Sequence, residues 1–344
     1  MNPFKTNRIG KTELEIPNLG FGGGTLGDPD VVVTEQQSFD TLAEAYDKGI
    51  RFYDTAPWYG IGKSEHRLGS SLREQSRADF VLNTKVGRYL TRPDDVDTFG
   101  QGRWAGGLSF EVNFDYTAAG LERSYRESLL RLSLNRVDSL IIHDLDYKFH
   151  GSMEGVDARF KELIDGGGYD YLKSLKESGE IKAIGVGINF SDLMPRFLEY
   201  CDIDFFLVAM PYTLLDQPVL ETSFPLCEKH GVSVISGAVF ASGILATGVK
   251  NNPLYGYQPA EDEIVSRVRA MERVCDRYDV PLGAAALQFP HGHPLVTSVI
   301  PGMNSPDIVR TNLEWFQLNI PNELWAELKE EGLLGVDVPT PVKD

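Results

Sequence analysis

The chain has 344 residues, of which 24% are charged and 42% are hydrophobic, and its formal net charge is −17 at pH 7. This composition is typical of a globular protein, and the length suits either two domains or a single α/β barrel. Because binding to phosphates requires clustered lysine and arginine, the acidic balance argues against nucleic acid and anionic lipid as partners.

The sequence also indicates where the protein works. No apolar run approaches the roughly 18 residues that cross a membrane, and the first residues lack the apolar core of a signal peptide. The three cysteines show no C-x-x-C spacing, which is typical of reduced thiols. We therefore expect a cytoplasmic protein with no membrane contact.

The first predicted elements are a β-hairpin and a strand–helix unit. Residues 5–17 resemble a hairpin, and residues 18–24 a short strand. A helix is predicted over residues 34–49, where Thr34 and Gln37 make a capping box. Its apolar residues recur at i, i+3, i+4 and i+7, as Phe39, Leu42, Ala43 and Tyr46.

The alternation of short apolar strand and amphipathic helix then continues to the end of the chain. Further strands are predicted over residues 50–54, 80–86, 137–144, 181–189, 203–212, 232–237 and 297–302. Most of these runs do not alternate in polarity, as expected where both faces of a parallel sheet are buried. Eight such units predict an α/β fold, a (β/α)8 TIM barrel with an N-terminal β-hairpin and extra C-terminal helices, as one domain over residues 1–344.

Three long segments that follow strands contain no clear element. They span about residues 87–115, 144–168 and 240–260, and they are longer than packing requires. Since function in such barrels lies on the loops after the strands, we expect these segments to enclose a substrate.

A glycine motif after the first barrel strand offers a competing interpretation. Gly22, Gly24 and Gly27 spell the G-x-G-x-x-G of a dinucleotide-binding fold, and Asp54 lies downstream like a ribose-binding acid. In that fold the third glycine opens a helix, whereas here the helix is expected only from Thr34. We therefore interpret the glycines as a tight turn where the backbone approaches another group closely.

Polar side chains occupy three successive strand ends. Asp54, Lys85 and His143 each close a predicted strand, and Tyr59 follows five residues after Asp54. Taken singly, each has a structural explanation, such as a loop cap, a solvated charge, a core histidine or a loop aromatic. Together they predict one site, because neighbouring parallel strands bring their ends to the same rim of a barrel.

The segments that carry these residues resemble the aldo-keto reductase superfamily. The matching motifs are DTAPWYG, SEHRLG, NTKVG, IIHD, GVGINF and SVIPG, in the family's order along nearly the whole chain. The resemblance implies a (β/α)8 barrel that binds a nicotinamide cofactor without a Rossmann fold. It also implies that Asp54, Tyr59, Lys85 and His143 form the catalytic tetrad.

The chemistry of these four residues agrees with that assignment. Hydride transfer to or from a carbonyl carbon needs a group that exchanges a proton with the oxygen. A free tyrosine has a pKa of about 10, and a nearby ammonium such as Lys85 favours its phenolate. Asp54 would hold Lys85 charged, and His143 would bond the carbonyl oxygen or relay the proton.

The resemblance further implies a set of cofactor contacts. They are Gly24, Thr25, Asp54, Asn189, Ser236, Phe240, Ser242, Gly243, Pro301, Gly302, Asn304 and Asn312. Ser236 stands where the family usually stacks an aromatic ring on the nicotinamide, and Phe240 is the alternative for that role. Ala209 stands where the family has a glutamine that holds the carboxamide.

The same comparison bears on the choice between NAD and NADP. Many family members bind the 2′-phosphate of NADP with two basic residues after strand eight. This sequence has Gly302-Met303 and Ile308 at those places, while Arg310 comes two positions late. We expect NAD as the cofactor, with NADP possible if Arg310 reaches the phosphate.

The expected substrate class comes from a resemblance to one subfamily. MPYTLLDQ, FASGILATG and QFPHGHPLVTSVIPG are similar to the subfamily of NAD-linked L-fucose or D-threo-aldose 1-dehydrogenases and pyridoxal 4-dehydrogenase. This implies oxidation of a sugar or pyridoxal to the lactone by a monomer or homodimer. The substrate contacts would include Leu26, Trp58, Tyr147 and Phe149.

Three other functions stay open on the sequence. They are a general aldehyde or ketone reductase that uses NADPH, a cofactor-binding regulatory subunit of a membrane channel, and a barrel aldolase whose Lys85 forms a Schiff base. No metal site is expected, because His291 and His293 lack an accompanying cluster of carboxylates or thiolates.

Overall fold

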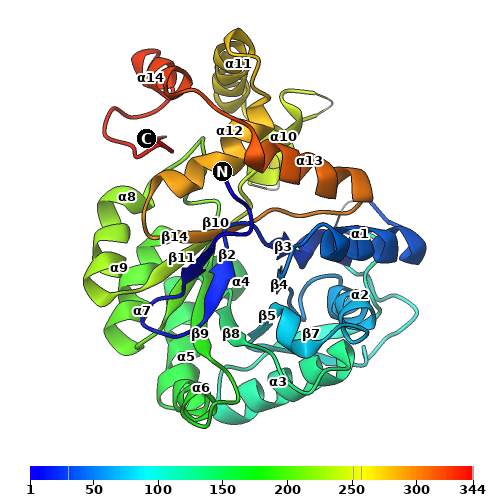
Figure 1. The fold of residues 1–344 in the computed structure, drawn as a ribbon. Coiled ribbons are helices and arrows are strands. Elements are labelled where there is room, and N and C mark those ends of the chain that lie inside the picture. The colour runs from blue at the N-terminus through cyan, green and yellow to red at the C-terminus, as the bar shows by residue number, and fades with distance from the viewer. Residues whose placement is uncertain (30, 251, 257, 343–344) are drawn as a thin grey trace.

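The computed structural model describes residues 1–29, 31–250, 252–256 and 258–342 of the chain (Figure 1). A parallel sheet of eight strands confirms the predicted barrel, in the spatial order β14-β11-β10-β9-β8-β5-β4-β3. Backbone bonds between its first and last strands close it, since Gly20 N donates to Val299 O at 2.9 Å and Gly22 N to Pro301 O at 3.0 Å. The strands are β3 (Phe21–Gly22), β4 (Phe52–Asp54), β5 (Val81–Val86), β8 (Ser139–His143), β9 (Ala183–Ile188), β10 (Phe205–Ala209), β11 (Ser233–Gly237) and β14 (Val296–Ile300).

Amphipathic helices surround the barrel. In α1 (Glu35–Asp47) the predicted cap is present, because Thr34 Oγ1 accepts a bond of 3.1 Å from Gln37 N, and Leu42 and Ala45 are buried against the sheet. No helix among the described residues is both long and apolar enough to span a membrane. The other main helices are α2 (Lys63–Leu72), α3 (Ala118–Leu132), α6 (Gly168–Glu177), α7 (Met194–Tyr200), α9 (Phe224–His230), α11 (Asp262–Arg277), α12 (Leu282–Gln288), α13 (Pro306–Gln317) and α14 (Asn322–Glu330).

The N-terminal hairpin plugs one end of the barrel. Strands β1 (Thr6–Arg8) and β2 (Glu15–Pro17) pair antiparallel and lie across the barrel opening nearest the viewer in Figure 1. Because Gly10 N donates to Ser233 Oγ, at the first residue of β11, the hairpin covers the end where the strands begin. Its apolar side chains join the barrel interior, which includes Ile9, Leu14, Ile16, Phe52, Ile141, Phe205, Leu207, Ile235 and Ile300.

The three long segments contain structure that the sequence analysis did not predict. Residues 87–115 include an antiparallel ribbon of β6 (Arg88–Thr91) and β7 (Glu111–Phe114). Residues 144–168 include α4 (Tyr147–His150) and the longer α5 (Met153–Ile164), which buries Val156, Phe160 and Leu163. The segment of residues 240–260 includes η4 (Ala241–Gly243), α10 (Ile244–Thr247), β12 (Leu254–Tyr255) and β13 (Gln258–Pro259). The short elements elsewhere in the chain are η1 (Gly23–Gly27), η2 (Arg77–Asp79), η3 (Ser191–Leu193), α8 (Val219–Thr222) and η5 (Phe289–Gly292).

Candidate active site

The strand order brings the predicted catalytic residues to one rim of the barrel. Asp54 is the last residue of β4, Lys85 is next to last in β5, and His143 is the last residue of β8. These strands are neighbours in the sheet, so the side chains meet at the end opposite the hairpin. Tyr59 enters from the loop between β4 and α2.

A buried ion pair lies at the bottom of the site. Lys85 Nζ donates to Asp54 Oδ2 at 2.6 Å and to the Thr55 carbonyl at 2.9 Å, and both charged side chains are almost fully buried. Burial raises the pKa of Asp54 and lowers that of Lys85, while the charge of each partner opposes the shift. Asp54 Oδ1 is buried and has no hydrogen-bond partner in the part of the chain that the structure describes.

Tyr59 lies directly above this pair. Lys85 Nζ is 4.7 Å from the centroid of the Tyr59 ring, and the His143 ring meets that ring edge-on at 5.9 Å between centroids. The glycine motif explains how the loop is held, because a Cβ on Gly27 would lie 2.3 Å from the backbone nitrogen of Gly60. Only glycine permits that approach of backbone to backbone.

His143 is held by a residue that the sequence analysis did not single out. Arg88 Nη1 lies 2.9 Å from His143 Nδ1, and Arg88 Nη2 donates to Asp144 Oδ2 at 2.9 Å. Burial, and then the charges of Arg88 and Lys85, hold the pKa of His143 well below its usual 6.5. The available sequence signal was an arginine directly after the NTKVG motif.

A cavity of about 620 Å³ opens over the four residues. Most of the predicted contacts line it: Gly24, Thr25, Asn189, Phe240, Ser242, Gly243, Pro301 and Gly302 from the cofactor set, and Trp58 and Phe149 from the substrate set. The backbone that lines the cavity is left-handed at three residues that are not glycine, namely Asp144, Ala238 and Ser242. Such strained backbone collects at binding sites, where the surrounding packing holds it in place.

Five predicted contacts do not line this cavity. Leu26 is fully buried in the core, and Tyr147 packs on Phe190 with 4.2 Å between ring centroids. Ser236 is buried within β11 and donates to the Tyr212 carbonyl, and the Asn304 carbonyl accepts from Gln37. The amide nitrogen of Asn312 is buried and has no partner within the described residues.

The wall of the cavity above Tyr59 is aromatic. Trp104, from the segment between β6 and β7, is 5.5 Å from Trp58 and 6.1 Å from Tyr59 between ring centroids. Phe149 meets Trp58 edge-on, with 6.1 Å between ring centroids. Trp104 has no periodic pattern around it, so only its place in a loop after a strand could have singled it out.

The paired histidines near the C-terminus have structural roles. His291 Nε2 lies 3.1 Å from the Asn18 carbonyl, and His293 packs edge-on against Phe224. Across the described ranges, no three histidine, cysteine, aspartate or glutamate side chains are grouped to hold a metal ion.

Comparisons with known proteins show the family to which the chain belongs. The model of the aldo/keto reductase family matches residues 18–331. Pyridoxal 4-dehydrogenase of Microbacterium luteolum is 36% identical over 334 residues, which cover 95% of this chain and 97% of that protein. D-threo-aldose 1-dehydrogenase of a Pseudomonas species is also 36% identical, over 95% of this chain and 96% of that protein.

A solved structure shares the architecture. The holo form of aldo-keto reductase AKR11C1 from Bacillus halodurans superposes with a TM-score of 0.72, at 25% identity, over 97% of this chain and 98% of that one. The family model covers most of the chain and the two dehydrogenases match nearly all of it. The chain is therefore an oxidoreductase that belongs to the aldo/keto reductase family.

Proposed function

We propose that this protein oxidises the hemiacetal carbon of a cyclic aldose, or of pyridoxal, to the lactone, with NAD as hydride acceptor. The observation that carries the proposal is the stacking of Asp54, Lys85 and Tyr59, with His143 against the tyrosine, at the floor of one cavity. The two dehydrogenases at 36% identity support the substrate class.

Each residue has a role that its surroundings allow. Tyr59, in its phenolate form, takes the hydroxyl proton of the substrate. The Lys85 ammonium, which lies 4.7 Å from the Tyr59 ring, favours that phenolate form. Asp54 keeps that ammonium charged in a buried place, and the Thr55 carbonyl orients it. His143 bonds the same substrate oxygen from the side. A bound NAD supplies the acceptor for the hydride that leaves the carbon.

Three observations in and near the cavity favour a bound dinucleotide, although Asn312 itself does not line the cavity. Asp54 Oδ1 and the Asn312 amide nitrogen are buried polar atoms without partners among the described residues. The backbone at Ala241 and Ser242 is left-handed, and such strained backbone collects at ligand-binding sites. We propose that Asp54 holds the nicotinamide ribose, that the 238–243 segment holds the diphosphate, and that Asn312 contacts the adenine.

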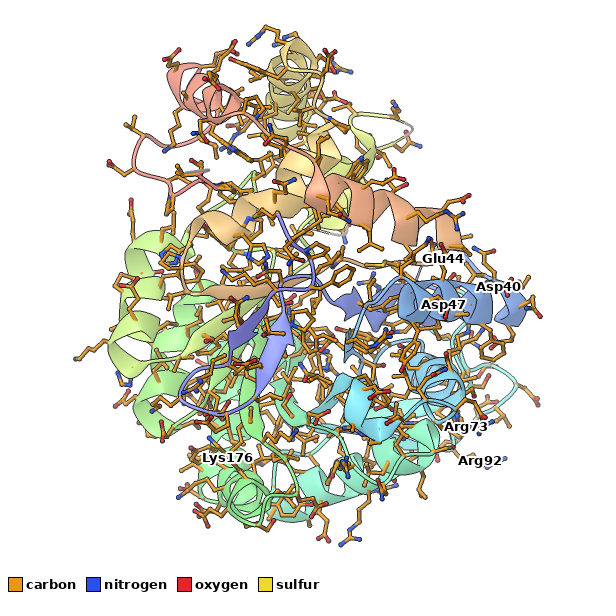
Figure 2. All side chains as sticks on the ribbon, viewed as in Figure 1. Asp40, Glu44, Asp47, Arg73, Arg92 and Lys176 are labelled. Carbon is orange, nitrogen blue, oxygen red and sulfur yellow. The ribbon has the colours of Figure 1, made fainter. Side chains whose placement is uncertain are left out.

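The adenosine end favours NAD over NADP. Arg310 Nη1 donates to Glu44 of α1 at 2.9 Å, and its Nη2 pairs with Asp307. Met303 is fully buried. Figure 2 labels Glu44 with the acidic Asp40 and Asp47 on α1, which packs beside α13. A 2′-phosphate would meet carboxylates here and lose much of its hydration, while Arg310 is already paired with two of these carboxylates.

The substrate half of the cavity suits a flat or cyclic molecule. Trp58, Trp104 and Phe149 present ring faces and edges above Tyr59. Sugars and pyridines both offer an apolar face for stacking on aromatic rings. This wall supports an aldose or pyridoxal over a small straight-chain aldehyde.

The test is a screen of aldoses, pyridoxal and simple aldehydes with NAD and with NADP, followed by the absorbance of the reduced cofactor. The proposal expects one lactone formed for each cofactor reduced, with an aldose or pyridoxal preferred. Reduction of simple aldehydes by NADPH without aldose oxidation would support the general reductase instead. Borohydride trapping of a substrate on Lys85 would support the Schiff-base alternative.

A further inference from the structure

Arg88 is an unusual residue to find inside a barrel. It begins β6, three residues after Lys85, and its side chain is only 1% exposed. Its guanidinium carbon lies 4.6 Å from the ring centroids of both Phe114 and Phe149. Burying a charge is costly unless it is paired and hydrogen-bonded, so the partners of Arg88 indicate its role.

The first partner determines the protonation of His143. A guanidinium has donors and no acceptor. Arg88 Nη1 lies 2.9 Å from His143 Nδ1, so that nitrogen must accept the bond through its lone pair. The proton of the neutral imidazole therefore lies on Nε2, the nitrogen on the other side of the ring.

The second partner acts in the same direction. Arg88 Nη2 donates to Asp144 Oδ2 at 2.9 Å, and this oxygen is 3.3 Å from His143 Nε2. A carboxylate beside Nε2 favours an N–H there. Asn189 Nδ2 donates a hydrogen bond of 2.9 Å to the other carboxylate oxygen, Asp144 Oδ1. The backbone of Asp144 is left-handed, with a φ of 49°. A cation at Nδ1 and an anion at Nε2 thus select one tautomer.

We propose that Arg88 is a positioning residue that holds His143 as the neutral Nε2–H tautomer, with Nε2–H free to donate a hydrogen bond to the substrate oxygen. The inference rests on the proposed function for the identity of that oxygen, but the tautomer itself does not depend on it.

The charged and hydrogen-bonding groups around His143 favour its neutral form. Two cations, Arg88 from β6 and Lys85 from β5, disfavour a charged imidazole, and Asp144 opposes them. Tyr59 faces the ring edge, and the Tyr116 hydroxyl bonds the His143 carbonyl at 2.8 Å. The single carboxylate of Asp144 is shared with Arg88 and Asn189, so two cations face the imidazole against one anion.

The first test reads the tautomer without any turnover. Nitrogen-15 NMR on histidine-labelled whole protein would assign His143 by comparison with His143→Gln. We expect Nε2 to be protonated, Nδ1 not, and no titration between about pH 5.5 and 8.5, whereas a free histidine titrates near 6.5. A proton on Nδ1, or a titration within that range, would overturn the proposal even if the enzyme oxidises the expected substrate.

The second test removes the guanidinium. Arg88→Met should lower kcat roughly 10- to 100-fold, as loss of a group that orients a catalytic residue does, and should let His143 titrate. Arg88→Lys keeps the charge and should recover part of the loss. If Arg88→Met does not fold, the double variant with Asp144→Asn removes cation and anion together. An unchanged tautomer and pH profile in these variants would refute the role of Arg88.

A matched control comes from the opposite end of the barrel. Arg77 lies over the Phe80 ring and donates to the buried Asp138 at 2.6 Å, so it also combines an aromatic contact with a buried carboxylate. Arg77→Met should destabilise the protein while leaving the His143 tautomer and the pH profile unchanged. Equal effects of the two substitutions on the pH profile would mean that Arg88 has only a structural role.

Discussion

At the scale of single residues, the proposed chemistry depends on one phenol. Tyr59 is the only one of the four clustered groups whose hydroxyl can exchange a proton with a substrate oxygen while Lys85 stays paired to Asp54. Burial and two cations hold the pKa of His143 beside it well below 6.5. We therefore expect proton transfer and orientation to belong to different side chains.

Tyr59→Phe should therefore lower kcat by at least about 100-fold, which is the lower range for general acid–base groups. Binding of NAD, measured by quenching of protein fluorescence, should change little. Tyr200→Phe, at a side chain that is 52% exposed, is the matched control and should keep full activity. Near-normal turnover of Tyr59→Phe would remove the tyrosine from the mechanism.

Lys85→Met tests the electrostatic part of the same site. With Lys85 present, the rate of oxidation should rise with pH through an apparent pKa well below about 10, because the ammonium favours the phenolate. Without it, activity should fall and the residual profile should move to higher pH. Asp54→Asn/Lys85→Met avoids an unpaired buried carboxylate and should show the same profile; a profile that matches the wild type would contradict the assignment.

At the scale of elements, the ribbon of β6 and β7 delivers Trp104 to the cavity. Trp104 is nearly fully buried and contacts both Trp58 and Tyr59. Gly106 N, on the same segment, bonds the Asp28 carbonyl, and Lys63 Nζ donates to the Gly106 carbonyl at 2.8 Å. These bonds fix the segment above Tyr59.

Trp104→Ala should raise KM for the aldose or pyridoxal about 5-fold, since an aromatic contact is worth roughly 1 kcal/mol beyond its buried area. The Kd for NAD should not change. Phe110→Ala, on the same segment but 42% exposed, serves as the control. An equal loss in both variants would mean that the segment matters only for stability.

We expect the contact between α1 and α13 to decide the cofactor preference. We expect kcat/KM with NAD to exceed that with NADP, because Arg310 is paired with Glu44 and Asp307. Ile308→Arg should improve kcat/KM with NADP by about 10-fold through one new charge-assisted bond. Leu130→Arg adds the same charge on α3, on the far side of the barrel in Figure 1, and should not. A wild-type preference for NADP would show that Arg310 leaves its carboxylates.

At the scale of the whole molecule, burial of neutral histidines makes stability depend on pH. Burial lowers the pKa of His291 to about 4, and it also lowers that of His143, His150 and His293. Below about pH 6.5 the unfolded chain binds protons at these positions while the folded chain does not. The contribution of these histidines to the free energy of unfolding is therefore fully present above about pH 6.5, and it is lost as the pH falls toward 4.

The free energy of unfolding, from urea titrations at pH 7, 6 and 5, should fall with pH. His291→Gln should reduce that fall by about 1 to 2 kcal/mol between pH 7 and 5, because it removes one of these protonation sites. His230→Gln, at an exposed position on α9, should leave the slope unchanged. If both variants keep the wild-type slope, His291 is not a source of the pH dependence.

Much of the architecture was determined by local sequence. All eight barrel strands lie where short apolar runs predicted them, because strands buried on both faces need apolar residues throughout. Asp54, Lys85 and His143 could be grouped before their positions were known, since adjacent parallel strands carry polar end residues to one rim. Motif resemblance added the family, which the comparisons confirm.

Other features were decided only in the folded protein. The apolar face of α5 could not be recognised in the sequence because glycine-rich segments flank it. In the ribbon, Arg88 pairs with Phe114, which is 26 residues later, and the polar chain between them shows no strand pattern. The bond between Arg88 and His143 joins residues 55 positions apart, and Trp104 reaches Tyr59 only because its segment folds back. Periodicity and strand-end polarity are local properties, whereas the pairing of a buried charge depends on which distant groups the fold brings within hydrogen-bond distance.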